Sequence, residues 1–229
     1  MIQSTDEKRC HSNPIQRSKP VHPAGGFETM SLEKCTGVMG SAREQQLQRL
    51  YQDIQNDRQY RNHRMGSIFV PGVGNPHGSV VFVGEAPGRE EELQRTPFVG
   101  PAGGNLNLLL DRIGWARNRL FITNLVKYRP LTATGGNRKP SLAESRYALG
   151  YLLQELVILD SQWVICLGNS SASVLVGRPG LKMSDVNGKV LPWKGRNLFV
   201  TYHPSPLNYN NPHRRQELIR DFDKLRCMG

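Results

Sequence analysis

The sequence lacks the long apolar segments of membrane and secreted proteins. Its 229 residues contain no run of about 18 apolar residues, the length that a membrane-spanning helix requires. The first residues carry no apolar stretch of the kind found in secretory signals. We therefore expect an intracellular protein without a membrane partner, in the cytoplasm or nucleoid if its source is bacterial or archaeal.

Cysteine is also scarce, and the cysteines that occur are widely separated. Cys10, Cys35, Cys166 and Cys227 form no CxxC pair, so their spacing favours neither a metal site nor a disulfide framework. Cys166 lies in the apolar run WVICLG and is expected to be a small core residue. The sequence therefore predicts no bound metal and a reducing compartment.

Acidic residues are outnumbered by basic ones. The chain has 30 Lys and Arg against 19 Asp and Glu, with a formal charge of +11 and a pI near 9.8. Most of the excess lies outside the N-terminal segment, so the globular part is itself basic. This distribution favours a polyanionic partner such as nucleic acid, although a generally cationic surface would give the same composition.

Composition divides the chain into a tail and one domain. Residues 1–40 are polar, are interrupted by prolines and a Gly-Gly pair, and lack periodicity. We predict a disordered or loosely docked tail there, available to a protein partner. Residues 41–229 hold enough apolar side chains for a single core and are expected to form one monomeric domain.

Strand and helix patterns alternate within residues 41–229. The apolar runs VVFVGEA, LFITNLV, WVICLG and LFVTYHP are typical of strands buried on both faces. Helical patterns lie between them, and a final helix is predicted with Asn211 as its cap and Pro212 at its first position. Residues 181–196 are expected to form a hairpin or loop. The alternation predicts an α/β three-layer sandwich, with a central four-stranded parallel sheet and helices on both faces.

Three polar residues stand where the expected strands end. They are Glu85 in the first run, Asn124 in the second and His203 in the fourth. Ligands of such sheets bind beyond the carboxyl ends of the strands, so we expect the three side chains to converge on one small polar ligand. The glycine-rich stretch after the first run matches neither a phosphate-binding loop nor a dinucleotide fingerprint.

In this order, the segments GEAPG, PFVG, TNLVKYRP and HPSPL resemble the uracil-DNA glycosylase superfamily, closest to its family-4 type, over roughly residues 44–226. The resemblance implies that residues 41–229 are a catalytic domain that flips uracil out of single- or double-stranded DNA. It further implies hydrolysis of the N-glycosidic bond to leave an abasic site. We expect a monofunctional base excision repair enzyme.

The resemblance also implies roles for individual residues. His203 would stabilise the departing uracil anion, while Glu85 would either position a water or stabilise the sugar cation. Asn124 would read the base, and Phe98 would stack on it. Further residues of the base pocket would be Gly84, Ala86, Pro87 and Gly88.

DNA contacts are expected from two segments. Leu207 would enter the space left by the flipped base, on a loop stiffened by prolines. An isolated exposed leucine would look the same in sequence. The other residues predicted to contact DNA are Lys127, Arg129, Ser205 and Pro206.

The chain departs from the family-4 pattern at the cysteines that hold a 4Fe-4S cluster. Asp57, Tyr60, Tyr128 and Ala148 stand at the four ligand positions, so we predict no cluster and no other cofactor, with tyrosines packing in its place. Arg95 replaces a glycine and would contact a phosphate or narrow the pocket mouth. A sister branch of the superfamily binds uracil-DNA covalently through a histidine in a basic inserted loop. The corresponding segment here, TATGGNRKP, contains no histidine, so we expect no covalent capture.

Two other functions remain open from sequence. The first is a non-catalytic module that binds uracil or damaged DNA without releasing the base. The second is an enzyme of the same fold that acts on another deaminated base, such as hypoxanthine or xanthine. Base-release and binding assays separate these alternatives.

Overall fold

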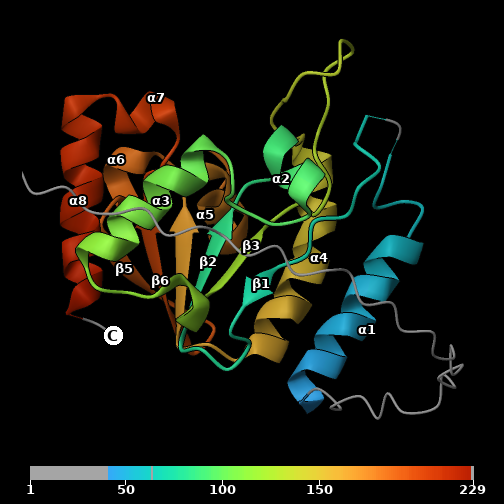
Figure 1. Cartoon of the computed structure of the whole chain (residues 1–229), viewed down its shortest axis with the longest axis horizontal. Coiled ribbons are helices and arrows are strands. Elements are labelled where there is room, and N and C mark those ends of the chain that lie inside the picture. Colours follow the sequence, from blue (N-terminus) through green and yellow to red (C-terminus); the bar gives the residue numbers. More distant parts are fainter. Residues whose placement is uncertain (1–40, 63, 228–229) are drawn as a thin grey trace, which may run out of the picture. The chain divides into compact units, whose positions relative to one another are not determined.

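The computed structural model describes residues 41–62 and 64–227 (Figure 1). The predicted N-terminal tail, residues 1–40, lies outside the described residues. None of the described helices combines the length and apolarity needed to cross a bilayer.

The centre of the domain is a six-stranded mixed sheet with the strand order β1-β3-β2-β4-β6-β5. Neighbours pair in parallel from β3 through β2 and β4 to β6, whereas β1 and β5 add antiparallel edges. The strands are β1 (Val73–Gly74), β2 (Val80–Gly84), β3 (Phe121–Asn124), β4 (Trp163–Leu167), β5 (Lys189–Trp193) and β6 (Arg196–Thr201).

The α/β class agrees with the sequence, but the predicted number of strands is wrong. β1 has only two residues, too few for a recognisable apolar pattern. β5 contains Pro192 and is largely exposed, as an edge strand can be. It forms a hairpin with β6 through Lys194 and Gly195, which both have positive φ. The sequence predicts a hairpin or a loop for residues 181–196, and the hairpin is confirmed for the part that forms β5.

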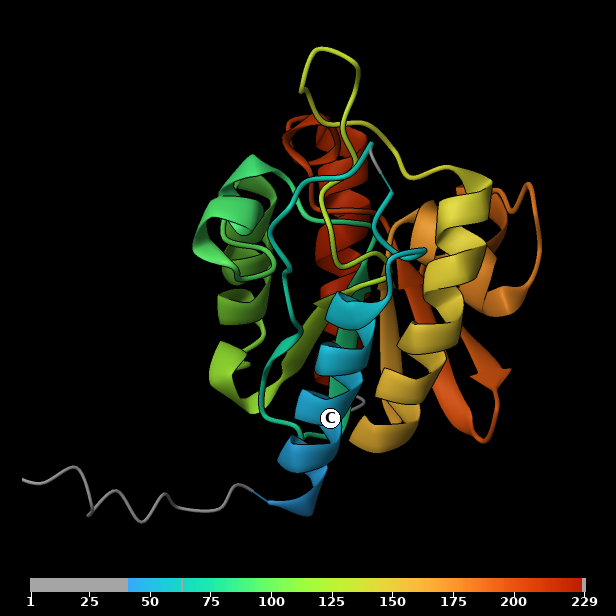
Figure 2. The ribbon, with the colours of Figure 1, turned by 90° about the vertical axis from the view of Figure 1, so that its right-hand side faces the viewer.

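Helices cover both faces of the sheet. One core packs side chains of α1, α4 and α5 against one sheet face, and a second core packs α3 and α8 against the other. Figure 2 shows α3 and α4 on opposite sides of the sheet. The helices are α1 (Ala42–Asn56), α2 (Arg89–Gln94), α3 (Pro101–Arg112), the 3-10 turn η1 (Arg117–Arg119), α4 (Leu142–Leu159), α5 (Asn169–Val176), α6 (Met183–Val186), α7 (Pro206–Tyr209) and α8 (Pro212–Arg226).

Local sequence explains where the long helices begin. Ser141 caps α4 in a capping box with Glu144. The side chain of Asn211 accepts a hydrogen bond from the Arg214 backbone, and Pro212 is the first residue of α8, as the sequence predicts. The parallel pairing of four strands places their carboxyl ends at one edge of the sheet, on the side where α2 and α7 lie (Figure 1).

Candidate functional site

A cavity of about 300 Å³ lies at the carboxyl ends of the parallel strands. The structure brings together there the three polar residues that the sequence places after separate strands. The cavity is lined by Glu85, Ala86, Pro87, Gly88, Glu91, Phe98, Pro101, Ala102, Asn124, Asn137, Arg138, His203 and Pro206.

Asn124 is the last residue of β3 and is 4% exposed. Its neighbour across the sheet is Gly84, the last residue of β2. A Cβ atom on Gly84 would lie 2.3 Å from Asn124 Oδ1 and 2.7 Å from the Phe98 ring. Gly84 is therefore the residue type that leaves room for the amide and the ring to meet in the cavity.

Phe98 lies in the cavity wall with a left-handed backbone, φ 55°, which is costly for an aromatic residue. Its ring centroid lies 5.6 Å from that of His203. Glu91 holds the surrounding loops, since its Oε1 accepts from Val99 N at 3.1 Å and Gly100 N at 2.8 Å. The other carboxylate oxygen accepts from Gly88 N at 3.1 Å. One carboxylate thus joins the loops on either side of α2.

His203 follows β6, and its backbone is fixed by Asn208, whose Nδ2 donates to His203 O at 2.8 Å. Burial lowers the pKa of His203 to about 4, and the nearby Glu91 carboxylate opposes this effect. The imidazole is therefore neutral at pH 7 and can donate one hydrogen bond.

Glu85 follows β2 and is held by a residue from another strand end. Ser170 Oγ donates to Glu85 Oε1 at 2.7 Å. Ser170 belongs to the first turn of α5, directly after β4. The carboxylate is thereby oriented at the edge where β2 and β4 lie side by side.

A second cavity, of about 560 Å³, shares Glu85 and His203 with the first. Lys139 and Arg214 also line it, together with Ser205, the N-cap of α7, and Leu207. Leu207 therefore stands in the short helix α7 and not on the loop that the sequence predicts. Leu207 is 79% exposed, the most of any large hydrophobic residue in the described part of the chain. Pro206 begins the short helix α7 and fixes its first turn.

Two basic residues predicted to contact DNA have other partners. The prediction for Lys127 is wrong, because its side chain is 1% exposed and pairs with Glu155 at 2.6 Å. Arg129 is half-buried and donates to Glu92 and Asn137. Its DNA contact stays a prediction, but its guanidinium is already engaged within the domain.

Arg95 caps α2 in a left-handed conformation, φ 52°, where glycine is the usual residue. It does not line the first cavity, so the interpretation that it narrows the pocket mouth is wrong. Arg95 lines a separate cavity together with Arg61 and Tyr128. The predicted phosphate contact is untested.

Three of the four family-4 ligand positions, Asp57, Tyr60 and Tyr128, lie in one cluster with two further tyrosines. We define the tyrosine cluster as Tyr60, Tyr128, Tyr147 and Tyr151 with Asp57. The Asp57 carboxylate accepts from the hydroxyls of Tyr147 and Tyr151 at 2.7 and 2.8 Å. The Tyr60 ring lies 5.9 Å from that of Tyr128 and 5.4 Å from that of Tyr151.

These residues do not fit an iron–sulfur cluster. Tyr60, Tyr128 and Ala148 are buried in one hydrophobic core, and none offers a thiolate. Cys166 is buried in the sheet, and burial raises the pKa of its thiol to about 12. Across residues 41–62 and 64–227, no group of three or more His, Cys, Asp or Glu is placed to hold a metal.

Sequence reasoning missed several residues of the site. Ser170 was detectable in principle, because GNSS directly follows the third apolar run and so occupies a strand end. Glu91 and Asn137 gave no such signal, since the chain reaches the cavity there through a loop and the short helix α2.

The chain is similar to known proteins of one family. A profile of the Uracil DNA glycosylase superfamily matches residues 71–225, a range that contains every residue lining the first cavity. The Type-4 uracil-DNA glycosylase of Archaeoglobus fulgidus is 36% identical over 183 residues, 77% of this chain and 89% of its own. That of Pyrobaculum aerophilum is 39% identical over 185 residues, covering 77% and 91%. That of Thermotoga maritima is 34% identical over 159 residues, covering 69% and 81%.

Proposed function

The chain belongs to the uracil-DNA glycosylase superfamily, and we propose that it releases uracil from DNA by hydrolysing the N-glycosidic bond, leaving an abasic site for base excision repair. The observation that carries this proposal is the convergence of Glu85, Phe98, Asn124 and His203 on one cavity of about 300 Å³. No cofactor enters the proposed reaction.

Asn124 supplies base selection in this proposal. Its amide can accept a hydrogen bond from uracil N3–H and donate one to uracil O4, whereas cytosine presents the opposite pair of groups. Phe98 provides an aromatic face for the ring without choosing among bases. Selectivity therefore depends on how accurately the amide is held.

Cleavage of the C1′–N1 bond sends the bonding electrons to uracil and leaves positive charge on the sugar. A water then adds its hydroxide to C1′, and its proton balances the uracil anion. The neutral His203 is suited to donate a hydrogen bond to the uracil O2 as negative charge develops there. Glu85, with Oε1 held by Ser170, either orients the water or stabilises the sugar cation.

We propose that base flipping uses the second cavity. Leu207 would fill the space that the base vacates, and Lys139 and Arg214 would face the DNA backbone. The formal charge of +11 favours such binding and makes it sensitive to salt.

The test is release of labelled uracil from single-stranded, U·A and U·G oligonucleotides. The intact protein should release the base, and Asn124→Ala and His203→Ala should each lower the single-turnover rate by about 100-fold or more. His77→Ala is the matched control, because His77 is exposed and precedes β2 at the opposite edge of the sheet.

The same assay addresses the two alternatives. Salt-dependent binding with the base left attached would favour a non-catalytic module and overturn the proposal. Release of hypoxanthine or xanthine in preference to uracil would instead assign the chain to another deaminated base.

A further inference from the structure

Lys127 and Glu155 form a buried ion pair that the proposed reaction does not use. Their side chains are 1% and 0% exposed, and Lys127 Nζ lies 2.6 Å from Glu155 Oε2. Burying two charges is costly, and apolar residues of similar size often replace such pairs without loss of stability. The pair therefore calls for an explanation beyond stability.

The contacts of Lys127 lead to the base-reading residue. Besides Glu155, its ammonium donates to Asn124 O at 2.9 Å and to Thr123 Oγ1. These contacts use all three donors of the ammonium. The carbonyl that Lys127 holds belongs to the last residue of β3, the residue whose side chain lies in the cavity.

The backbone of Lys127 is fixed as well. Its N–H donates to Tyr60 Oη at 3.0 Å, and its carbonyl accepts from Val70 N at 2.9 Å. Lys127 thus cannot move without disturbing the tyrosine cluster or the segment that leads into β1.

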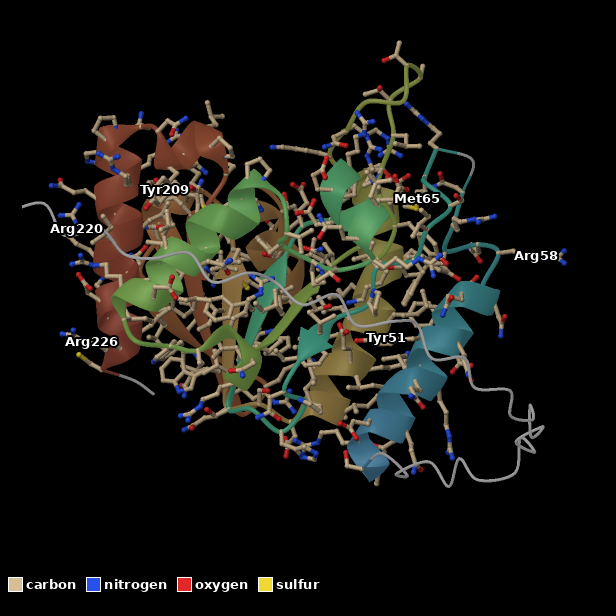
Figure 3. The ribbon with its side chains drawn as sticks, viewed as in Figure 1. Tyr51, Arg58, Met65, Tyr209, Arg220 and Arg226 are labelled. Carbon is tan, nitrogen blue, oxygen red and sulfur yellow. The ribbon has the colours of Figure 1, made fainter. Side chains whose placement is uncertain are left out.

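Glu155 is anchored in turn from the helix layer. Its Oε1 accepts from the Tyr51 hydroxyl at 2.6 Å, and that hydroxyl oxygen accepts from Gly72 N at 3.1 Å. Figure 3 shows Tyr51 on the side of α1 that faces α4. The network therefore connects α1 and α4 to the end of β3.

We propose that Lys127, held by Glu155, is a positioning residue that fixes Asn124 for reading the base. This inference rests on the proposed function of Asn124. Loss of the ammonium frees the last carbonyl of β3 and lets the amide adopt several orientations. A small misplacement in a reacting site can lower a rate by about 100-fold.

The test removes both charges together, so that no unpaired ion is left in the core. Lys127→Met/Glu155→Gln keeps similar volume and an amide that can still bond Tyr51. The double variant should lower the single-turnover rate of uracil release by about 10- to 100-fold. Its affinity for DNA should stay unchanged, because Lys127 does not reach the surface. The matched control is Arg112→Met/Asp223→Asn, which removes an exposed ion pair of α3 and α8 and should leave the rate unchanged.

Two readouts separate positioning from a general structural role. With Asn124→Ala already present, the Lys127/Glu155 change should cause no further loss of rate, whereas an additive loss would overturn the inference. The NMR signal of the Asn124 side-chain amide, assigned by its disappearance in Asn124→Ala, should shift or broaden in the pair variant only.

The NMR measurement requires no catalysis, so it remains decisive if the wild-type protein releases no uracil. Absence of release with a displaced amide signal would refute the proposed function alone. An unchanged amide signal in the pair variant would refute the positioning role, whatever the activity.

Discussion

Ser170 and Glu85 are joined by a hydrogen bond of 2.7 Å between residues that follow two neighbouring strands, β4 and β2. Ser170→Ala should leave Glu85 free to rotate and lower the single-turnover rate of uracil release by about tenfold, since hydrogen bonds to charged groups contribute about 1.5–3 kcal/mol. Ser173→Ala is the control, because Ser173 lies in the same helix and its hydroxyl bonds Asn169 rather than a residue of the site. Equal rates for the two variants would remove Ser170 from the site.

Gly84→Ala should abolish uracil release and destabilise the fold. The added Cβ would overlap Asn124 Oδ1 and the Phe98 ring, and such overpacking costs about 1–3 kcal/mol. Gly104→Ala in α3 is the control, because the added Cβ would meet no part of the protein outside its own helix turn within 4 Å. That variant should gain up to about 1 kcal/mol in urea unfolding. A fully active Gly84→Ala protein would show that the amide and ring need no such clearance.

The imidazole of His203 should titrate well below the ordinary range of a histidine. Burial lowers its pKa to about 4, which NMR of the ring Cε1–H can follow. Unfolding restores an ordinary pKa near 6.5, so the unfolded chain binds more protons between these values. The contribution of His203 to stability is therefore complete above about pH 6.5 and is lost as the pH falls toward 4. A midpoint near 6.5 in the folded protein would contradict this burial.

Arg95→Gly should stabilise the protein by about 1 kcal/mol, measured by urea unfolding. Arg95 has φ 52° at the end of α2, a conformation that strains residues with a Cβ but not glycine. Arg89→Gly at the first position of the same helix should lower stability or leave it unchanged. A destabilised Arg95→Gly protein would reveal a contact of the arginine that outweighs its strain.

Protein purified without oxygen should contain no stoichiometric iron and no visible absorption band. The residues at the expected ligand positions are a carboxylate, two phenols and a methyl group, which do not supply the thiolates that iron–sulfur clusters use. A brown protein with about four irons per chain would require ligands from outside the described residues.

The sequence predicts residues of the site best where a polar side chain stands at the end of an apolar run. Glu85, Asn124 and His203 could be identified because each ends a strand or follows one within two residues, and parallel strands end at one edge. The burial of Lys127 could not be foreseen, since its partner Glu155 lies 28 residues away on α4 and the local segment reads as basic. β1 was missed because two residues carry no periodicity.

The tyrosine cluster also bears on how the protein matures. The tyrosine rings and Asp57 pack against one another in this part of the domain, so its packing is provided by the polypeptide alone. We therefore expect the chain to reach its working state straight from synthesis, independent of iron delivery and of the assembly machinery that inserts prosthetic groups. Oxidants that attack thiolate-bound iron would find no thiolate among the residues of this cluster.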